Sequence, residues 1–321
     1  MTRLSAITPS GHAHLGNYLG AIRRWASDGA DGDLYFVSDL HAMTTAYHPQ
    51  RLRATSTELL AILLAAGIDA DRVCVQSDLM GQLGALTWVL ECTCSYGEAS
   101  RMTQFKERTA AADGVRLSLL TYPVLMAADI LLQGAAEVPV GADQLQHVEL
   151  ARSLARRFNT AFGEVFVVPK ALVARTAGRV MDLADPSRKM SKSAREEAGV
   201  VFLLDDPDLI RRKVRRAVTD GLDRLEYRPV EQPGLANLLE IAAACTGDTP
   251  AKVAATAGGY AALKELVAEA VIEELRPLRE QTRRLLADPT GLDAIRRAGA
   301  ARATERGAHR LAAATRLAGI G

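Results

Sequence analysis

The chain has 321 residues, of which 48% are hydrophobic and 24% are charged, a composition typical of a globular protein long enough for two domains. This composition excludes a collagen, a disordered chain and a small disulfide-stabilised scaffold. The 39 basic and 38 acidic side chains give a formal net charge of +1, so a nucleic-acid surface would have to be a local patch.

The beginning of the chain, MTRLSAITPSG, lacks the apolar core of a signal peptide, and no run of 18 apolar residues could span a bilayer. The four cysteines, at 74, 92, 94 and 245, have neither CxxC nor zinc-site spacing, which favours reduced thiols. We therefore expect a cytoplasmic protein that does not enter a membrane.

Short β-like runs alternate with helical stretches in the first half. We expect strands over 3–8, 33–37, 72–76 and 137–140, and helices over 16–26, 83–95, 98–112 and 119–132. A further apolar helix is bracketed by Pro49 at its start and Gly67 past its end. Strands separated by such helices predict an α/β fold with a parallel, doubly wound sheet, whose ligands bind beyond the carboxyl ends of the strands.

The second half loses the strand signal after about residue 197. Helices are predicted over 206–218, 232–245, 249–255, 260–288 and 291–317. We therefore expect two domains, a sheet-containing domain over 1–197 and a mostly helical domain over 198–321, whose last helix could pack back on the first domain.

The first motif with chemistry is TPSGHAHLGNY, at residues 8–18, where the first strand turns into a helix. A helix N-terminus offers unpaired N–H groups that suit phosphate, and His14 and Asn17 can both donate to one bound polyphosphate. A turn without a ligand is the alternative. The patterns GxGxxG and GxxxxGK[ST] are absent, which argues against a dinucleotide site of the Rossmann type and a P-loop.

The second motif is Lys-Met-Ser-Lys-Ser at residues 189–193. Its two lysines could form a cationic clamp for the charge that develops on a transferring phosphoryl group, whereas a solvated basic loop is the alternative. Only seven of the 39 basic residues are lysines. Two of these seven lie in this motif, which favours a role that a compact ammonium group fills better than a guanidinium.

Together, HLGN and KMSKS resemble the two signatures of the class I aminoacyl-tRNA synthetases. The segments between and after them resemble the tryptophanyl-tRNA synthetase branch: 39–44 (DLHAMT), 97–106 (GEASRMTQFK), 120–131 (LTYPVLMAADIL), 138–144 (VPVGADQ) and 233–239 (PGLANLL). The resemblance implies a Rossmann-like catalytic domain that binds ATP between the two signatures. It also implies a helical domain that reads the anticodon of a tRNA.

The resemblance assigns tryptophan recognition to one carboxylate and an apolar pocket. Asp129 would accept the indole N–H, and on a helix it shares a face with Tyr122 and Met126. Phenylalanine would leave this carboxylate unpaired, which gives strong discrimination. The other implied tryptophan-binding residues are His41, Val138, Val140 and Gln144. Ordinary helix core is the alternative for Tyr122 and Met126.

The resemblance also implies an ATP site and a reaction. The catalytic residues would be His14, Asn17, Lys189 and Lys192, and the other ATP-binding positions Thr8, Pro9, Ser10, Gly16, Gly141, Ala142, Asp143, Val180, Met190, Ser191 and Ser193. Asp143 could instead be a plain helix cap. The implied substrates are L-tryptophan, ATP with Mg²⁺ and tRNA(Trp), with no metal held by the protein. Adenylate formation with release of pyrophosphate would be followed by transfer to the tRNA.

A basic run at the start of the helical half is the candidate tRNA contact: Arg211, Arg212, Lys213, Arg215 and Arg216. A solvated helix face is the alternative. Arg101, Lys106 and Arg108 form a weaker candidate set for the acceptor end of the tRNA. The resemblance further implies a homodimer, with each tRNA crossing both subunits.

Three positions depart from the usual pattern of the family. Ala6 and Ala142 stand where glycine and glutamate are usual, and Thr8 replaces a glutamine that contacts the ligand. These changes leave open a tyrosine-specific relative, a paralogue without efficient aminoacylation, and an auxiliary enzyme that tolerates inhibitors resembling tryptophan.

Overall fold

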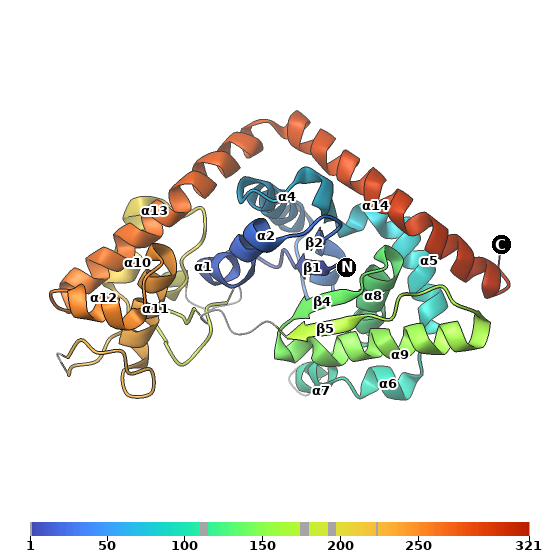
Figure 1. Ribbon diagram of the computed structural model, residues 1–321, viewed down its shortest axis with the longest axis horizontal. Coiled ribbons are helices and arrows are strands. Elements are labelled where there is room, and N and C mark those ends of the chain that lie inside the picture. The colour runs from blue at the N-terminus through green and yellow to red at the C-terminus, as the bar shows by residue number, and fades with distance from the viewer. Residues whose placement is uncertain (1, 110–114, 174–179, 192–196, 223, 321) are drawn as a thin grey trace.

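A parallel sheet forms the centre of the computed structural model, which describes residues 2–109, 115–173, 180–191, 197–222 and 224–320. Its strands are β1 (Leu4–Ile7), β2 (Leu34–Val37), β3 (Val73–Val75), β4 (Glu137–Val140) and β5 (Lys170–Val173). β2 pairs in parallel with β1 and β3, and β4 pairs in parallel with β5. A parallel bridge between Arg3 and Glu137 joins β4 to the remaining side of β1, so the order is β3-β2-β1-β4-β5. The strands β2, β1, β4 and β5 follow one another in Figure 1.

Helices occupy the connections between these strands. They are α1 (Leu15–Asn17), a π-helical turn (Tyr18–Ile22), α2 (Arg23–Asp28), α3 (Asp39–Ala42), α4 (Pro49–Ala65), α5 (Met80–Glu91), α6 (Tyr96–Ser100), α7 (Thr103–Thr109), α8 (Leu117–Gln133) and α9 (Leu145–Phe162). The predicted α/β fold with a parallel sheet is confirmed. The predicted helix over 98–112 is wrong in one respect, because α6 ends before Arg101 and α7 begins separately. Strand β5 was not predicted.

The sheet separates two apolar cores, and β2 shows why. All four of its side chains are buried, with Tyr35 and Val37 on one face and Leu34 and Phe36 on the other, as the alternation along a strand requires. The first face packs against α4 and continues into the helices of the second half, whereas the second face packs against α5, α8 and α9.

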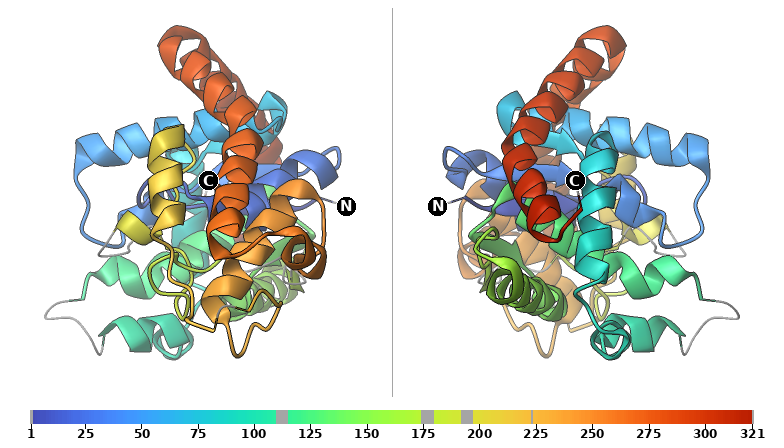
Figure 2. Two further views of the ribbon diagram at one scale, coloured as in Figure 1. Left: turned by 90° about the vertical axis from the view of Figure 1, so that its left-hand side faces the viewer. Right: turned by 90° about the vertical axis from the view of Figure 1, so that its right-hand side faces the viewer.

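The second half is helical where the structure describes it. Its helices are α10 (Pro207–Arg215), α11 (Pro233–Thr246), α12 (Pro250–Thr256), α13 (Tyr260–Ala287) and α14 (Pro289–Leu317). The long helices α13 and α14 meet at an angle, and α14 returns along α5 (Figures 1 and 2). Gln133 of α8 donates to the Ala303 carbonyl of α14 at 3.1 Å. The domain boundary at 197/198 stays a prediction.

Gly299 allows α14 to lie directly on the sheet edge. A methyl group added at Gly299 would lie 2.4 Å from the backbone oxygen of Val73, and the backbone at that position cannot move without displacing β3. We expect Gly299→Ala to destabilise the fold by about 1–3 kcal/mol, seen as a lower thermal midpoint. Gly84→Ala, inside α5, is the matched control. Its methyl group would meet no described heavy atom within 4 Å, so the midpoint should stay or rise.

Candidate active site

The carboxyl ends of β1 and β4 lie side by side at the point where the order of the strands reverses direction. In an open parallel sheet, the connections after two such strands leave toward opposite faces and open a crevice between them. The segment after β1 contains the HLGN motif, and the segment after β4 contains Gly141 and Gln144. Two adjoining cavities occupy this crevice, and both are lined by Ala6, Thr8 and Ser10.

The first of these, the inner cavity, has a volume of about 410 Å³. All seven residues predicted to bind tryptophan line it: His41, Tyr122, Met126, Asp129, Val138, Val140 and Gln144. They come from α3, α8, β4 and the turn after β4. The helical spacing in α8 therefore brings Tyr122, Met126 and Asp129 to one wall, as predicted from the sequence.

Asp129 lines the inner cavity and is almost completely buried. Gln76 Nε2 lies 2.9 and 2.8 Å from its two carboxylate oxygens, and His41 Nδ1 lies 3.9 Å from Oδ2. Burial raises the pKa of Asp129 to about 8, although the hydrogen bond from Gln76 acts to lower it. Burial lowers the pKa of His41. Near pH 7, the pair is therefore a mostly protonated carboxyl beside a neutral imidazole.

Gln76 was not predicted from the sequence. Its side chain is fully buried, and besides Asp129 it contacts His41 Nδ1 at 2.9 Å and accepts from the Leu40 backbone N–H at 3.1 Å. It thus orients both Asp129 and His41, which line the inner cavity. A glutamine at the last position of the predicted strand 72–76 was the only signal that could have indicated it.

A chain of polar groups forms the opposite rim of the inner cavity. The Tyr122 hydroxyl donates to Gln104 Oε1 at 2.9 Å and lies 3.0 Å from His147 Nε2, whose Nδ1 lies 2.7 Å from Gln144 Oε1. Gln144 Nε2 donates to Asp143 at 2.8 Å. Gln104 and His147 were not predicted. The N-cap residues are Gly141 for the helical turn 142–144 and Gln144 for α9, so the interpretation of Asp143 as a plain N-cap is wrong.

The second cavity, the outer cavity, has a volume of about 500 Å³ and brings the two sequence motifs together. The lining residues with predicted roles are Thr8, Ser10, His14, Gly16, Asn17, Lys189, Met190 and Ser191. Pro9, Ala142, Asp143 and Val180 are not part of the lining of either cavity. Lys192 and Ser193 lie outside the described residues.

The loop of the HLGN motif is tightly constrained. His14 is buried, and its backbone N–H donates to Asn17 Oδ1 at 3.2 Å. A methyl group added at Gly16 would lie 3.1 Å from the His14 ring nitrogen Nδ1, so glycine is what lets the imidazole lie over the start of α1.

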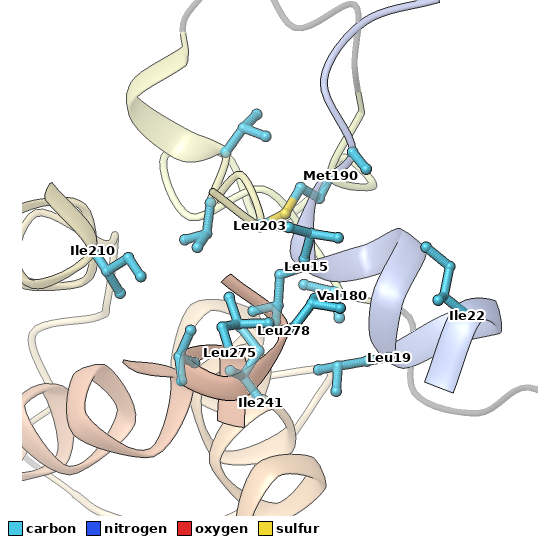
Figure 3. Packing of buried hydrophobic residues seen from close by; sticks show 14 of the residues in the cluster. Leu15, Leu19, Ile22, Val180, Met190, Leu203, Ile210, Ile241, Leu275 and Leu278 are labelled. Atoms are coloured by element: carbon cyan, nitrogen blue, oxygen red, sulfur yellow. The ribbon is translucent and has the colours of Figure 1, made fainter. Parts of the chain in front are cut away.

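The second motif is anchored through its methionine. Met190 is buried in the same core as Leu15 and Val180, and its N–H donates to the Val180 carbonyl at 3.1 Å (Figure 3). Lys189, next to it, is exposed at the mouth of the outer cavity. An apolar anchor thus presents a cation to a cavity that the HLGN motif lines from the other side.

Comparison with known proteins identifies this arrangement. The family model described as "tRNA synthetases class I (W and Y)" matches residues 1–276. The chain belongs to this family. Tryptophan–tRNA ligase 1 of Streptomyces coelicolor is 52% identical over 312 residues, which cover 94% of this chain and 93% of that protein.

Solved structures agree with this family assignment. Tryptophanyl-tRNA synthetase from Mycoplasma pneumoniae has a TM-score of 0.88 at 32% identity, covering 100% of this chain and 98% of that one. The Campylobacter jejuni enzyme, solved in complex with ADP and tryptophan, has a TM-score of 0.84 at 28% identity, with 100% of both chains covered.

The structure does not place all five cations of the basic run where a tRNA could contact them. Lys213 is buried and forms an ion pair with Asp205 at 2.7 Å, so its place among the tRNA candidates is wrong. Arg211 pairs with Glu269 and Asp208, and Arg216 lies just past the end of α10. Arg212, Arg215 and Arg216 are exposed.

In the weaker tRNA set, Arg101 lies just past the end of α6, and Lys106 and Arg108 belong to α7. Arg101 donates to the Gly97 carbonyl at 2.7 Å, and Lys106 is exposed. The side chain of Arg108 is outside the described residues. Among the described residues, no helix is long and apolar enough to cross a membrane, and no group of three or more His, Cys, Asp or Glu side chains could hold a metal ion.

The side chain at the altered position 8 is hydrogen-bonded to a residue in the wall of the inner cavity. The Thr8 hydroxyl lies 3.1 Å from the Ser38 hydroxyl, and both residues line the inner cavity. Thr8 is therefore tied to the wall in a place where a longer glutamine would reach into the cavity. We expect Ala6→Gly with Thr8→Gln to change the ratio of the inhibition constant of an indole-based tryptophan analogue to the KM for tryptophan. An unchanged ratio would mean that neighbouring residues compensate for both departures.

The raised pKa of Asp129 predicts a pH dependence of tryptophan binding. A carboxylate accepts an N–H more strongly than a protonated carboxyl does, and Asp129 ionises only as the pH rises through about 8. The KM for tryptophan should therefore fall between pH 6 and 8.5. It should not vary in this way in Asp129→Asn. A wild-type KM that is flat over this range would contradict the expected role of Asp129.

Proposed function

We propose that the chain is a tryptophan–tRNA ligase, which activates L-tryptophan with ATP and transfers it to tRNA(Trp). The observation that carries this proposal is the inner cavity, which combines apolar side chains with the buried carboxyl group of Asp129 and adjoins a cavity that both class I signatures line. The relatives named tryptophan–tRNA ligase support the same choice of amino acid.

The indole ring occupies the inner cavity in this proposal. Met126, Val138 and Val140 contact its faces, and its N–H donates to Asp129. The ammonium and carboxylate groups lie at the polar rim, where Tyr122 and Gln144 can bind them. The carboxylate then points toward Thr8 and Ser10, the part of the wall that the two cavities share.

ATP with its Mg²⁺ occupies the outer cavity. A tryptophan carboxylate oxygen attacks the α-phosphorus in line, the bond from this phosphorus to the bridging oxygen of the β-phosphate breaks, and pyrophosphate leaves. Such a transfer needs positioning and charge stabilisation more than covalent help. His14 and Asn17 supply donors from one side, and Lys189 supplies a cation from the other. The resemblance to the family assigns a second cation to Lys192.

The second step transfers the acyl group. The 2′-hydroxyl at the 3′ end of the tRNA attacks the acyl carbon, the bond to the adenylate oxygen breaks, and AMP leaves with the electron pair. No protein nucleophile is needed. The four cysteines are free thiols, and burial raises the pKa of Cys74 and Cys245, so these two stay protonated.

The tRNA contacts, the assembly and the location belong to the same proposal. Arg212, Arg215 and Arg216 present cations to a tRNA from the helical half. The resemblance to the family supports a homodimer, whose interface could bury exposed apolar side chains such as Tyr96 and Leu117, which are 75% and 73% exposed. The cell compartment is the cytoplasm, where cysteines stay reduced.

The test is aminoacylation of purified tRNA(Trp) and tRNA(Tyr) with labelled tryptophan and tyrosine. The proposal expects charging of tRNA(Trp) with tryptophan alone. Charging of tRNA(Tyr) with tyrosine would establish the tyrosine-specific alternative. Adenylate formation without charging of either tRNA would establish an auxiliary paralogue.

A further inference from the structure

The backbone around His14 is held by a segment from the beginning of the helical half. The Leu15 N–H donates to the Val201 carbonyl at 2.8 Å, the Leu203 N–H donates to the Ala13 carbonyl at 2.9 Å, and His14 and Phe202 form an antiparallel bridge between these bonds. Because the His14 side chain lines the outer cavity, a displacement of residues 201–203 would displace His14 with respect to bound ATP.

Lys213 of α10 fixes the segment in turn. Its Nζ donates to the Val200 carbonyl and to Asp205 Oδ2, both at 2.7 Å. The same Asp205 oxygen accepts the Phe202 N–H at 2.9 Å, and Nζ also lies 4.8 Å from the centre of the Phe202 ring. Two hydrogen bonds therefore connect the lysine to the residue that pairs with His14.

The burial of this ion pair indicates that the lysine has a specific role. The side chains of Lys213 and Asp205 are only 8% and 9% exposed. Transferring two charges out of water costs more free energy than an ion pair at the surface contributes to stability. Lys213 occupies an inward position of α10 beside Ile210 and Val214, whereas Arg212 and Arg215 face solvent. Ile210, Leu203 and Leu15 belong to one core (Figure 3).

Lysine is also the residue that this geometry requires. The chain has only seven lysines among its 39 basic residues, and one of these lysines is at position 213. A compact ammonium group reaches a backbone carbonyl and a carboxylate within one small buried space, whereas the planar guanidinium of arginine is larger and needs a wider arrangement of acceptors.

We propose that Lys213 is a positioning residue for adenylate formation. It holds Asp205 and Val200 in place, so that residues 201–203 keep the His14 loop in register against the outer cavity. This inference rests on the proposed function of that cavity. It places a residue of the basic run on the inside of α10, where it supports the ATP site from the helical half.

The test compares Lys213→Met with Lys264→Met in tryptophan-dependent exchange of pyrophosphate into ATP. Lys264 is a matched control, because its Nζ donates to the Ala217 carbonyl at 2.8 Å and the Arg215 carbonyl at 3.2 Å, at the end of the same helix, rather than to residues 200–205. We expect Lys213→Met to lower kcat/KM for ATP by about 10–100-fold, with the KM for tryptophan unchanged. Lys264→Met should leave both unchanged.

A rescue variant separates positioning from general loss of structure. Adding Asp205→Asn to Lys213→Met removes the unpaired buried charge but keeps an oxygen that can accept the Phe202 N–H. The kcat/KM for ATP of the double variant should therefore lie between those of Lys213→Met and the unmodified enzyme. If Lys213→Met alone does not fold, the double variant is used to measure whether kcat/KM for ATP falls while the KM for tryptophan stays unchanged.

Three results would overturn the inference: unchanged ATP kinetics in Lys213→Met, equal losses in Lys213→Met and Lys264→Met, or a rise in the KM for tryptophan that matches the loss for ATP. The absence of tryptophan-dependent exchange in the unmodified enzyme would overturn the proposed function and this inference with it.

Discussion

Replacement of Asp129 by asparagine should lower kcat/KM for tryptophan activation by about 10–150-fold at pH 8.5, where the carboxyl is mostly ionised, because it removes a charge-assisted hydrogen bond worth about 1.5–3 kcal/mol. The substitution keeps the shape of the side chain and an oxygen that Gln76 can contact, so the fold should persist. The measurement is tryptophan-dependent exchange of pyrophosphate into ATP, with the KM for ATP recorded alongside.

Asp39→Asn is the matched control for this prediction. Asp39 is another buried carboxyl whose pKa is raised by burial, and it accepts the Ser77 backbone N–H at 2.9 Å. It does not line the inner cavity. A loss specific to Asp129→Asn would support recognition of the indole N–H. A wild-type kcat/KM in Asp129→Asn would show that Asp129 does not bind it.

Removal of the lysines of the second motif should slow adenylate formation with little effect on tryptophan binding. Lys189 is exposed at the mouth of the outer cavity, where its cation can meet charge that develops as pyrophosphate leaves. An interaction made mainly in the transition state affects kcat rather than ground-state affinity. We expect Lys189→Ala to lower kcat by about a hundredfold, and the same of Lys192→Ala.

Lys170→Ala is the control for the lysine variants. Lys170, on β5, is also an exposed lysine, and it forms an ion pair with Glu137 of β4 at 3.6 Å. It is not in the lining of either cavity. Single-turnover measurement of adenylate formation separates kcat from tryptophan affinity. Equal losses in kcat and in tryptophan affinity would assign Lys189 and Lys192 to binding.

Local patterns predicted the parts of the fold that depend on local physics. The apolar run 33–37 became β2, and the run between Pro49 and Gly67 became α4 with Pro49 at its first position. The helical spacing of Tyr122, Met126 and Asp129 placed them on one wall of the inner cavity. By contrast, β5 is half exposed at the edge of the sheet, so it carries no strong apolar pattern.

The errors at the site have a different cause, because they concern contacts between distant parts of the chain. Gln76 acts through Asp129, which lies 53 residues away, and no local pattern indicates such a pair. Lys213 was grouped with its neighbours by charge. The spacing of Ile210, Lys213 and Val214 would have placed it on the buried face of α10. The assignment of tryptophan, ATP and tRNA came from the resemblance to a family rather than from any of these patterns.

Recognition of the indole N–H by the inner cavity is tested most directly with an analogue of tryptophan in which sulfur replaces this group, 3-(benzothiophen-3-yl)alanine. The two compounds have nearly the same shape, so only the hydrogen bond to Asp129 distinguishes them. The measurement is kcat/KM for each compound in pyrophosphate exchange. We expect the unmodified enzyme to prefer tryptophan by about a hundredfold, and Asp129→Asn to lose most of this preference. Equal kcat/KM values for the two compounds in the unmodified enzyme would contradict the account.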